Sequence, residues 1–419
     1  MFPIGELTLM VLKSAVVSMT EPSFLLIFGA VLFLVYTQYR RMAAAELQMY
    51  GTIINPPGAQ LLNAIWAGLA GGAVGTVLFV FPGIALPGPG IYYIWMIALL
   101  LALIHPRFIC FAYGGGLVAL SSLLFGEPQI NVGALMALVA VLHLVEAVLI
   151  RLQGARNVTP VYTRRSDGRV VGGFLLQKFW PLPFVALLGV IVAGELPEGA
   201  GLAMPNWWPL IGAPDASRPG LSSFFMLLPV VAALGYGDIA LTSSPQAKAR
   251  RTSQHLLIYS LCLLFLAALA NTHFLWALAA ALFSPLAHEL VIYLGRYQEE
   301  KGEPVYTAEK GAVILAVLPD SPASAMGLRP GDIIRTVNGY PIANRHDVLQ
   351  AVSPWAFELT VEVEDGTTGE KRVVRHQGRV PPIGVIFAPE GHEQPFMHLN
   401  QPGWIVRLWR RRMQAKNQG

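Results

Sequence analysis

The sequence predicts an α-helical polytopic membrane bundle of about nine spans, followed by a small α/β domain with a partly open antiparallel β-barrel. The chain of 419 residues is 54% hydrophobic and only 13% charged, and its mean hydropathy is +0.53. A soluble protein of this length needs more polar surface, so lipid is the expected solvent. Apolar blocks run to about Leu294, and from Arg296 onward the composition is that of a water-soluble domain.

A charged linker at 295–304 marks the boundary between these two parts. The predicted segments are an N-terminal interfacial segment at 1–20, a multi-span transmembrane domain at 21–295, a folded domain at 303–390 and a basic amphipathic tail at 391–419. The first segment is placed at the interface because Glu6 and Lys13 interrupt its apolar stretch.

The individual spans follow from the length that a helix needs to cross the hydrocarbon core, roughly 20 residues. They are predicted at 22–38, 60–81, 91–104, 108–125, 131–150, 179–196, 222–241, 255–270 and 274–294. The third and fourth are short, and they form either a tight helical hairpin or a re-entrant pair. Glycine runs at 68–75 and 114–116 are expected to allow close helix packing. Cys110 and Cys262 lie in apolar blocks and are interpreted as packing residues.

Basic residues in the short loops predict the orientation, because they stay on the cytosolic face during insertion. With the N-terminus outside, the inner side collects Arg40, Arg41, Arg107, Arg151, Arg156, Arg164, Arg165, Arg169, Lys178, Lys248, Arg250, Arg251 and Arg296. The outer side keeps only Lys13 and Arg218. An odd number of spans then places the C-terminal domain in the cytosol.

The tail contains four candidate membrane-surface residues, Trp404, Trp409, Arg410 and Arg411. On a helix the aromatic residues share one side and the arginines surround them, which favours an anionic inner leaflet. The alternative is a solvated, frayed terminus.

The C-terminal domain has clear sequence signals for where its helices, strands and turns begin and end. A β-branched run at 311–318 predicts a buried strand, and Ser321 is placed as the N-cap of a short helix that Gly327 ends. Asn338 and Gly339 predict a hairpin turn. Asn344 is placed as the cap of a second helix, and strands are predicted around 359–363, 372–376 and 383–387.

The motif from Gly311 to Gly339 resembles bacterial PDZ domains in its turn, cap and strand residues. The resemblance implies capture of an extended peptide at an open sheet edge beside a helix. The predicted peptide-binding residues are Ile383, Gly384, Val385 and Ile386, with His346, Leu349 and Gln350 of the second helix opposite. The alternative is that Gly384 only marks a bulge and that Leu349 belongs to the core.

Two short motifs raise intramembrane proteolysis as an alternative function. Gly235-Tyr-Gly-Asp238 resembles the motif of intramembrane aspartyl proteases, but those enzymes need a second aspartate and the predicted spans contain none. His288 and Glu289 are similar to the start of a zinc-protease helix, but the second histidine is missing because position 292 is Ile292. We therefore predict no catalytic residues, no metal, no cofactor and no nucleic-acid partner.

Five ionisable residues fall near the predicted cytosolic ends of their spans, and burial there is costly without a partner. They are His143, Glu146, Asp238, His288 and Glu289. We predict that the fifth, seventh and ninth spans share them as an intramembrane polar cluster. The alternative is that each side chain reaches the interface alone.

The whole layout resembles the MinJ family of Gram-positive division-site proteins, and 142–146, 172–181, 235–238 and 284–289 look like membrane signatures of that family. The resemblance implies a non-enzymatic adaptor at septum and poles that links the polar scaffold DivIVA to MinD through its PDZ domain. A transporter would require internal repeats or matched broken helices, and the sequence has no convincing repeat.

Overall fold

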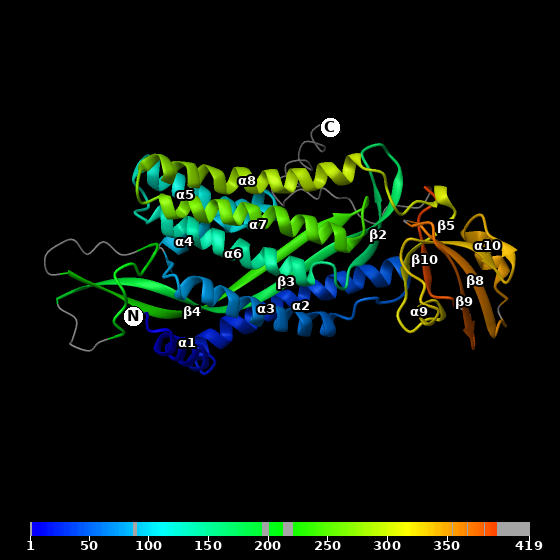
Figure 1. Ribbon diagram of the computed structural model, residues 1–419, viewed down its shortest axis with the longest axis horizontal. Helices are drawn as coiled ribbons and strands as arrows, with labels where there is room; N and C mark the ends of the chain where they lie inside the picture. The colour runs from blue at the N-terminus through cyan, green and yellow to red at the C-terminus, as the bar shows by residue number, and fades with distance from the viewer. Residues whose placement is uncertain are drawn as a thin grey trace, which may run out of the picture.

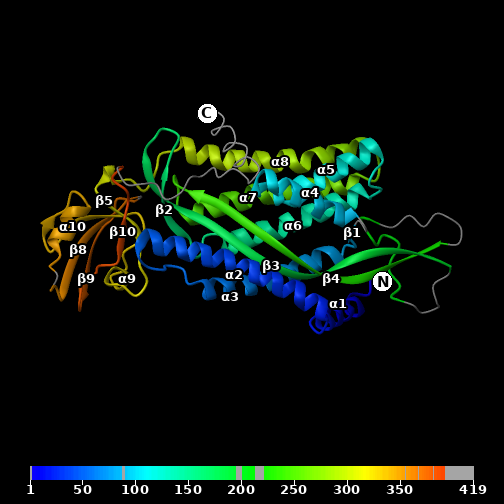
Figure 2. The same cartoon turned by 180° about the vertical axis from the view of Figure 1, so that it is seen from behind.

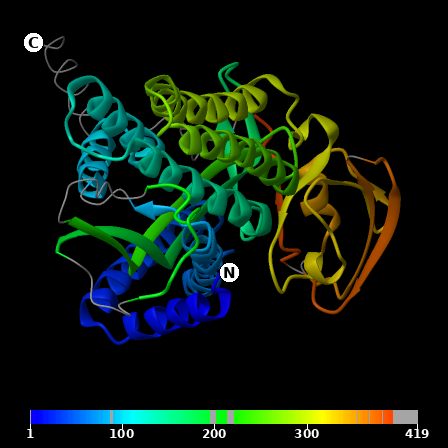
Figure 3. The ribbon, with the colours of Figure 1, turned by 60° about the vertical axis from the view of Figure 1, so that its left-hand side comes forward.

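The computed structural model describes residues 2–86, 90–194, 201–212, 221–353, 355–366, 368–380 and 382–391. A long membrane lobe and a smaller β-rich lobe lie end to end, with the β-rich lobe formed by the C-terminal part of the chain (Figures 1 and 2). Seen from the side, the C-terminal lobe stands next to the helices as a separate body (Figure 3).

Among the described residues, five helices are long and apolar enough to cross a membrane. They are α2 (Pro22–Tyr50), α3 (Pro57–Val80), α6 (Val132–Gln153), α7 (Pro245–Leu269) and α8 (Phe274–Lys301). Helix α6 lies at the centre, where nearly all of its apolar side chains are buried. The structure therefore confirms a helical membrane lobe but does not confirm nine spans.

Three further helices complete the membrane lobe. Helix α1 (Ile4–Ser18) precedes the first long helix. The short apolar helices α4 (Gly90–Ile104) and α5 (Phe111–Phe125) contact each other and are joined by the 3-10 turn η1 (Pro106–Ile109). The two helices thus lie side by side, and both alternatives for the third and fourth spans, a tight helical hairpin and a re-entrant pair, stay open.

The predicted sixth and seventh helical spans are wrong, because this part of the chain forms two long strands. Strand β3 (Val170–Ala193) and strand β4 (Leu221–Ala240) pair antiparallel from Phe174–Ala240 to Ala193–Leu221. At roughly 3.3 Å per residue, each is longer than the ~30 Å hydrocarbon core. They run along the helices and extend past them at the end far from the C-terminal lobe (Figure 1).

The error has a physical cause. A continuous apolar run has no period that separates a buried helix from a strand buried on both faces. Pro181 and Pro183 interrupt the run at alternate positions, and a helix interior would lose hydrogen bonds and clash at both rings. The length of the run therefore indicates a helix, whereas the prolines favour an extended chain.

The backbone groups along the outer edge of β3 form hydrogen bonds with two short strands and, between these strands, with side chains. Strand β2 (Thr159–Arg164) pairs with its start, and β1 (Ala85–Leu86) pairs near its end. In between, the Phe179 N–H donates to the Tyr39 hydroxyl at 3.2 Å and the Val185 N–H donates to Thr76 Oγ1 at 2.9 Å. These bonds allow an edge strand to exist where no water is available.

Between Phe179 and Val185, the alternate positions of this edge are Pro181 and Pro183, which have no N–H to satisfy. Their carbonyl oxygens face α3, where Gly68 and Gly72 allow the backbones to touch. A Cβ added at Gly68 would lie 1.8 Å from the Pro181 oxygen, and one at Gly72 would lie 1.9 Å from the Pro183 oxygen. The first glycine run therefore packs chiefly against a strand, whereas Gly114 and Gly116 contact helices α4 and α8 as predicted.

The C-terminal lobe is a sheet of order β10-β5-β6-β8-β9 with β7 paired to β6. Its elements are β5 (Ala312–Val317), α9 (Pro322–Ala325), β6 (Asp332–Val337), β7 (Tyr340–Pro341), α10 (Arg345–Ala351), β8 (Glu358–Asp365), β9 (Lys371–Gln377) and β10 (Val385–Phe387). The predicted helix caps and turns are confirmed. Ser321 and Asn344 cap the two helices, and Gly327 and Asn338 have positive φ.

The C-terminal lobe is attached to the membrane lobe by direct contacts. The Tyr162 hydroxyl of β2 donates to the Phe387 carbonyl of β10 at 2.8 Å. The Arg165 guanidinium donates to the carbonyls of Gly302, at 3.0 Å, and Glu300. These bonds fix the linker and one sheet edge against the β2–β3 hairpin.

Candidate functional site

The predicted peptide groove lies between β10 and α10. Strand β10 is at the end of the sheet, and its outer edge pairs with no other strand among the described residues. The Phe387 carbonyl of β10 already accepts from Tyr162, and the predicted binding residue Ile386 is buried in the core. Arg345 at the start of α10 makes an ion pair of 3.4 Å with Glu390, just after β10. Leu349 is four residues further along the helix and shares the face of Arg345. The ion pair thus links the start of α10 to the residues after β10, and the peptide groove between them stays a prediction.

The side chains of α10 that are predicted to face a ligand are accessible. Leu349 is 64% exposed, and His346 and Gln350 are also exposed, whereas the neighbouring Val348 is fully buried in the core. Leu349 is therefore not a core residue. An apolar side chain with this exposure, beside an unpaired edge, is suited to contact a peptide side chain.

Gly384 takes a conformation that suits a tight loop. Its φ is +79°, and a Cβ would lie 2.2 Å from Cβ of Ser321, the cap of α9. The carbonyls of Ile383 and Gly384 accept from the N–H groups of Ala323 and Leu318. The irregular step in the pairing of β10 comes later, between Ile386 and Phe387. Gly384 is therefore a close-approach loop residue and not the bulge itself.

A cavity of about 700 Å³ opens beside the groove. Asp167 and Arg169, in the turn between β2 and β3, line one side of the cavity. The C-terminal lobe lines the other side with Glu309, Asn344 and Glu390. The cavity has a mixed polar and apolar lining and lies between the two lobes, next to the end of β10. It has room for several residues of an extended chain.

The five ionisable residues predicted to form one cluster separate into two groups. Asp238 lies in strand β4, where it is 3.3 Å from Lys248 Nζ and accepts from Thr252 Oγ1 at 2.7 Å. Lys248 is only 1% exposed and also contacts Glu299 at 3.3 Å. Lys248 therefore lies between the carboxylates of Asp238 and Glu299. The three side chains form an ion-pair network and not the proton-sharing carboxylate pair of an aspartyl protease.

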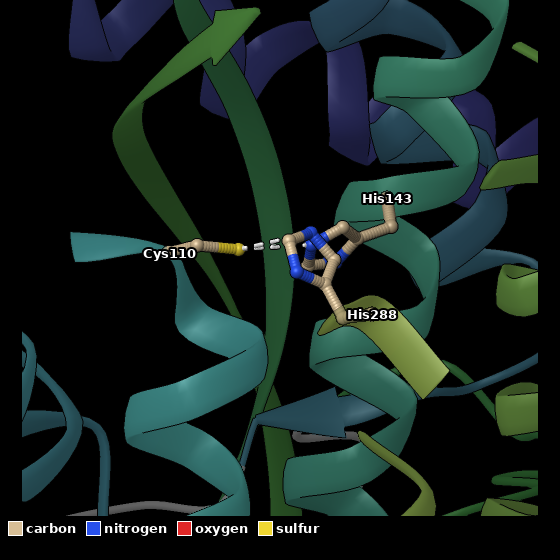
Figure 4. Close-up of side chains that lie close together, drawn as sticks. All are labelled: Cys110, His143 and His288. Atoms are coloured by element: carbon tan, nitrogen blue, oxygen red, sulfur yellow. Dashed lines mark hydrogen bonds between the residues drawn. The ribbon is translucent and has the colours of Figure 1, made fainter. Parts of the chain in front are cut away.

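The other group joins α5, α6 and α8. The rings of His143 and His288 are 5.1 Å apart, and Cys110 Sγ is 3.1 Å from Nε2 of His143 (Figure 4). Glu289 points to other partners: it accepts from the Tyr113 hydroxyl at 2.5 Å and pairs with Arg107 at 3.2 Å. Of the predicted cluster, His143 and His288 thus lie together, whereas Asp238 lies in the other group.

Several residues of these groups carry no recognisable signal in the sequence. The sequence indicates only a packing role for Cys110, and only loop charges at Lys248 and Arg107. Glu299 looks like one more charge of the linker, yet it is 2% exposed and accepts from the N–H groups of Leu241 and Thr242. Only the three-dimensional arrangement shows these pairings. The predicted tail residues Trp404, Trp409, Arg410 and Arg411 lie outside the described residues.

Fold and site together define a membrane protein with apolar helices and a C-terminal PDZ domain. A family model for the PDZ domain matches residues 313–364. The chain is 25% identical over 245 residues to the cell division topological determinant MinJ of Bacillus subtilis (strain 168), which is 57% of each protein. It is 30% identical over 88 residues to the probable cell division topological determinant MinJ of Lacticaseibacillus paracasei, covering 20% of this chain and 24% of that one.

These comparisons confirm the resemblance to MinJ-type determinants that the sequence predicts. The matched region spans 57% of the length of the Bacillus subtilis relative, so the similarity covers little more than half of that protein. The fold and the domain match support a membrane protein with a protein-interaction domain.

Proposed function

We propose that this protein is a non-enzymatic membrane adaptor whose PDZ domain binds peptides of division proteins on the cytosolic side. The proposal rests chiefly on the exposed Leu349 of α10, together with a β10 edge that pairs with no strand among the described residues. Main-chain hydrogen bonds to β10 would provide affinity, and side-chain contacts to α10 would provide selectivity.

The resemblance to MinJ suggests the partners. A DivIVA-like polar scaffold and a MinD-like division regulator are the proteins we propose to be linked, at the septum and the poles. The bound segment is either a C-terminus, held by N–H groups near Gly384, or an internal stretch that extends into the cavity beside Asn344. The cavity supports the second mode because it continues past β10.

Replacing Leu349 with glutamate is expected to weaken partner binding at least about 10-fold, because a charge would face the apolar contact that the peptide makes. The measurement is co-purification of DivIVA-like and MinD-like proteins with the full chain from solubilised membranes. Val373→Glu is the matched control, since Val373 is 61% exposed on β9 at the opposite end of the sheet. Equal recovery with both variants would remove the groove from the proposal.

The cytosolic placement predicts the result of a reporter experiment. A reporter fused after Gly419 that fluoresces only in the cytosol is expected to be bright, because basic residues gather at the ends of the elements near the PDZ domain. The orientation also requires that successive crossings alternate in direction. Two of the nine predicted crossings are strands, and these two strands still run in opposite directions. A fusion active only after export would contradict both the orientation and the adaptor role.

Intramembrane proteolysis remains a second candidate only through the motif around Asp238. Its carboxylate is engaged by Lys248 and Thr252, which favours a structural role. A protease would accumulate uncleaved substrate when Asp238 is replaced by asparagine, whereas the adaptor is expected to show only changed stability.

A further inference from the structure

We propose that Cys110, His143 and His288 form an intramembrane binding site for a thiophilic d¹⁰ metal ion, Zn²⁺ or Cu⁺. One ligand atom from each residue lies within 4.8 Å of the other two. The three come from separate elements, the start of α5, the middle of α6 and the second half of α8 (Figure 4). The site is independent of the PDZ domain and of the adaptor function proposed for it.

The distances are those of a coordination sphere. Cys110 Sγ is 3.1 Å from Nε2 of His143 and 3.7 Å from Nε2 of His288. Tetrahedral zinc with Zn–S of about 2.3 Å and Zn–N of about 2.0–2.1 Å separates sulfur from nitrogen by roughly 3.5 Å. A small shift of the side chains would thus place one ion between all three atoms.

The orientation of His143 is fixed by the protein in the manner of a metal ligand. Its Nδ1 is 2.7 Å from the carbonyl of Val139, so Nδ1 holds the proton and Nε2 presents its lone pair to Cys110. The side chain is only 3% exposed. A backbone acceptor behind the ring sets the tautomer that a metal requires.

The hydrogen bonds within the group are weak and leave one buried atom without a partner. The Cys110 thiol can donate to Nε2 of His143, and its sulfur can accept from an Nε2–H of His288. Nδ1 of His288 is buried and has no hydrogen-bond partner among the described residues. The ring is held between the aromatic rings of Tyr113 and Tyr259, with centroids 5.3 and 5.6 Å away. Metal binding would replace the two weak sulfur hydrogen bonds with coordination by Sγ and both Nε2 atoms.

Ligand chemistry and charge select the metal. A thiolate with two imidazoles favours Zn²⁺ and Cu⁺ over Mg²⁺ or Ca²⁺. Binding releases the Cys110 proton to solvent, because the thiolate is the ligand. Glu146 lies three residues after His143, on the same side of α6, and interacts electrostatically with Cys110. An ionised Glu146 would offset the remaining charge of Zn²⁺, while Cu⁺ is already neutralised by the thiolate.

The zinc-protease motif requires two histidines on one helix, and this chain lacks the second of them. That motif fails because Ile292 follows His288 where a histidine is needed. The structure supplies the other ligands from different elements of the chain. A metal bound by all three residues is expected to hold α5, α6 and α8 together.

The test uses the full-length protein purified in detergent and loaded with Co²⁺ as a spectroscopic substitute for Zn²⁺. We expect about one ion per chain and a thiolate-to-cobalt charge-transfer band. Cys110→Ser should lose the band and weaken metal binding about 100-fold or more. The matched control is Cys262→Ser, because Cys262 is the exposed cysteine of α7 and should leave the band unchanged. Titration with Zn²⁺ and with Cu⁺ in reductant then separates the two ions.

The wild-type spectrum decides the matter even if a variant fails to fold. Wild-type protein that binds no stoichiometric Co²⁺, Zn²⁺ or Cu⁺, or binds cobalt without a thiolate band, overturns the proposal. So does an equal loss of the band in Cys262→Ser. Adventitious binding only, in which Cys110→Ser retains the full stoichiometry, also overturns it.

Discussion

Replacing Gly72 with alanine is expected to destabilise the membrane lobe by roughly 3 kcal/mol or more, at or above the upper end of ordinary overpacking. The added Cβ would lie 1.9 Å from the backbone oxygen of Pro183, and a strand paired along its length cannot move away easily. The measurement is the unfolding midpoint temperature of the purified protein in detergent, together with the monodisperse fraction.

Gly29→Ala is the matched control for this experiment. Gly29 lies within α2, and a Cβ added there would have no neighbouring atom within 4 Å. Alanine is the better helix former by about 1 kcal/mol, so this variant should melt at or slightly above the wild-type temperature. Equal melting of Gly72→Ala and Gly29→Ala would mean that α3 does not pack directly on the edge of β3.

Replacing Lys248 with methionine is expected to destabilise the protein by about 3–5 kcal/mol, because it leaves buried carboxylates without their counter-ion. Lys248 is 1% exposed and contacts Asp238 and Glu299, each at 3.3 Å. The ammonium also donates to the Gly295 carbonyl at 3.0 Å, so one side chain connects β4, α7 and α8. Thermal unfolding in detergent measures the effect.

A double variant separates the ion pair from simple loss of packing. Lys248→Met combined with Glu299→Gln should be less destabilised than the sum of the two single variants, since the orphaned charge is removed. Arg250→Met is the control, because Arg250 is exposed on the same helix and should change stability by less than about 0.5 kcal/mol. Additive single and double variants would contradict a coupled network.

These two predictions concern the contacts of the β3–β4 pair, which lies between the membrane helices and the C-terminal lobe. The long β3–β4 pair runs beside the helices toward the C-terminal lobe, and the β2–β3 hairpin contacts that lobe. Loosening either the Gly72 contact or the Lys248 network is therefore expected to disturb the docking of the peptide groove as well as stability.

The PDZ domain could be predicted almost completely from sequence because its signals are local. Ser321, Gly327 and Asn344 have the expected cap or stop geometry, and Leu359, Val361 and Val363 are all buried, as their alternation indicates. Caps, turns and period-two alternation depend on residues a few positions apart. The groove residues rest on resemblance, and their role in binding stays a prediction.

The sequence by itself determined that the chain is apolar enough for a membrane, where its water-soluble domain begins, and how that domain folds. Only the tertiary structure decided that 170–193 and 221–240 are strands, that Gly68 and Gly72 meet proline carbonyls, and that His143 and His288 converge on Cys110. The physical reason is that lipid-facing and protein-facing apolar residues look alike in a sequence. Whether such an apolar run forms a helix or a strand therefore depends on partners far along the chain. These partners provide the hydrogen bonds of the backbone and bring buried polar side chains together.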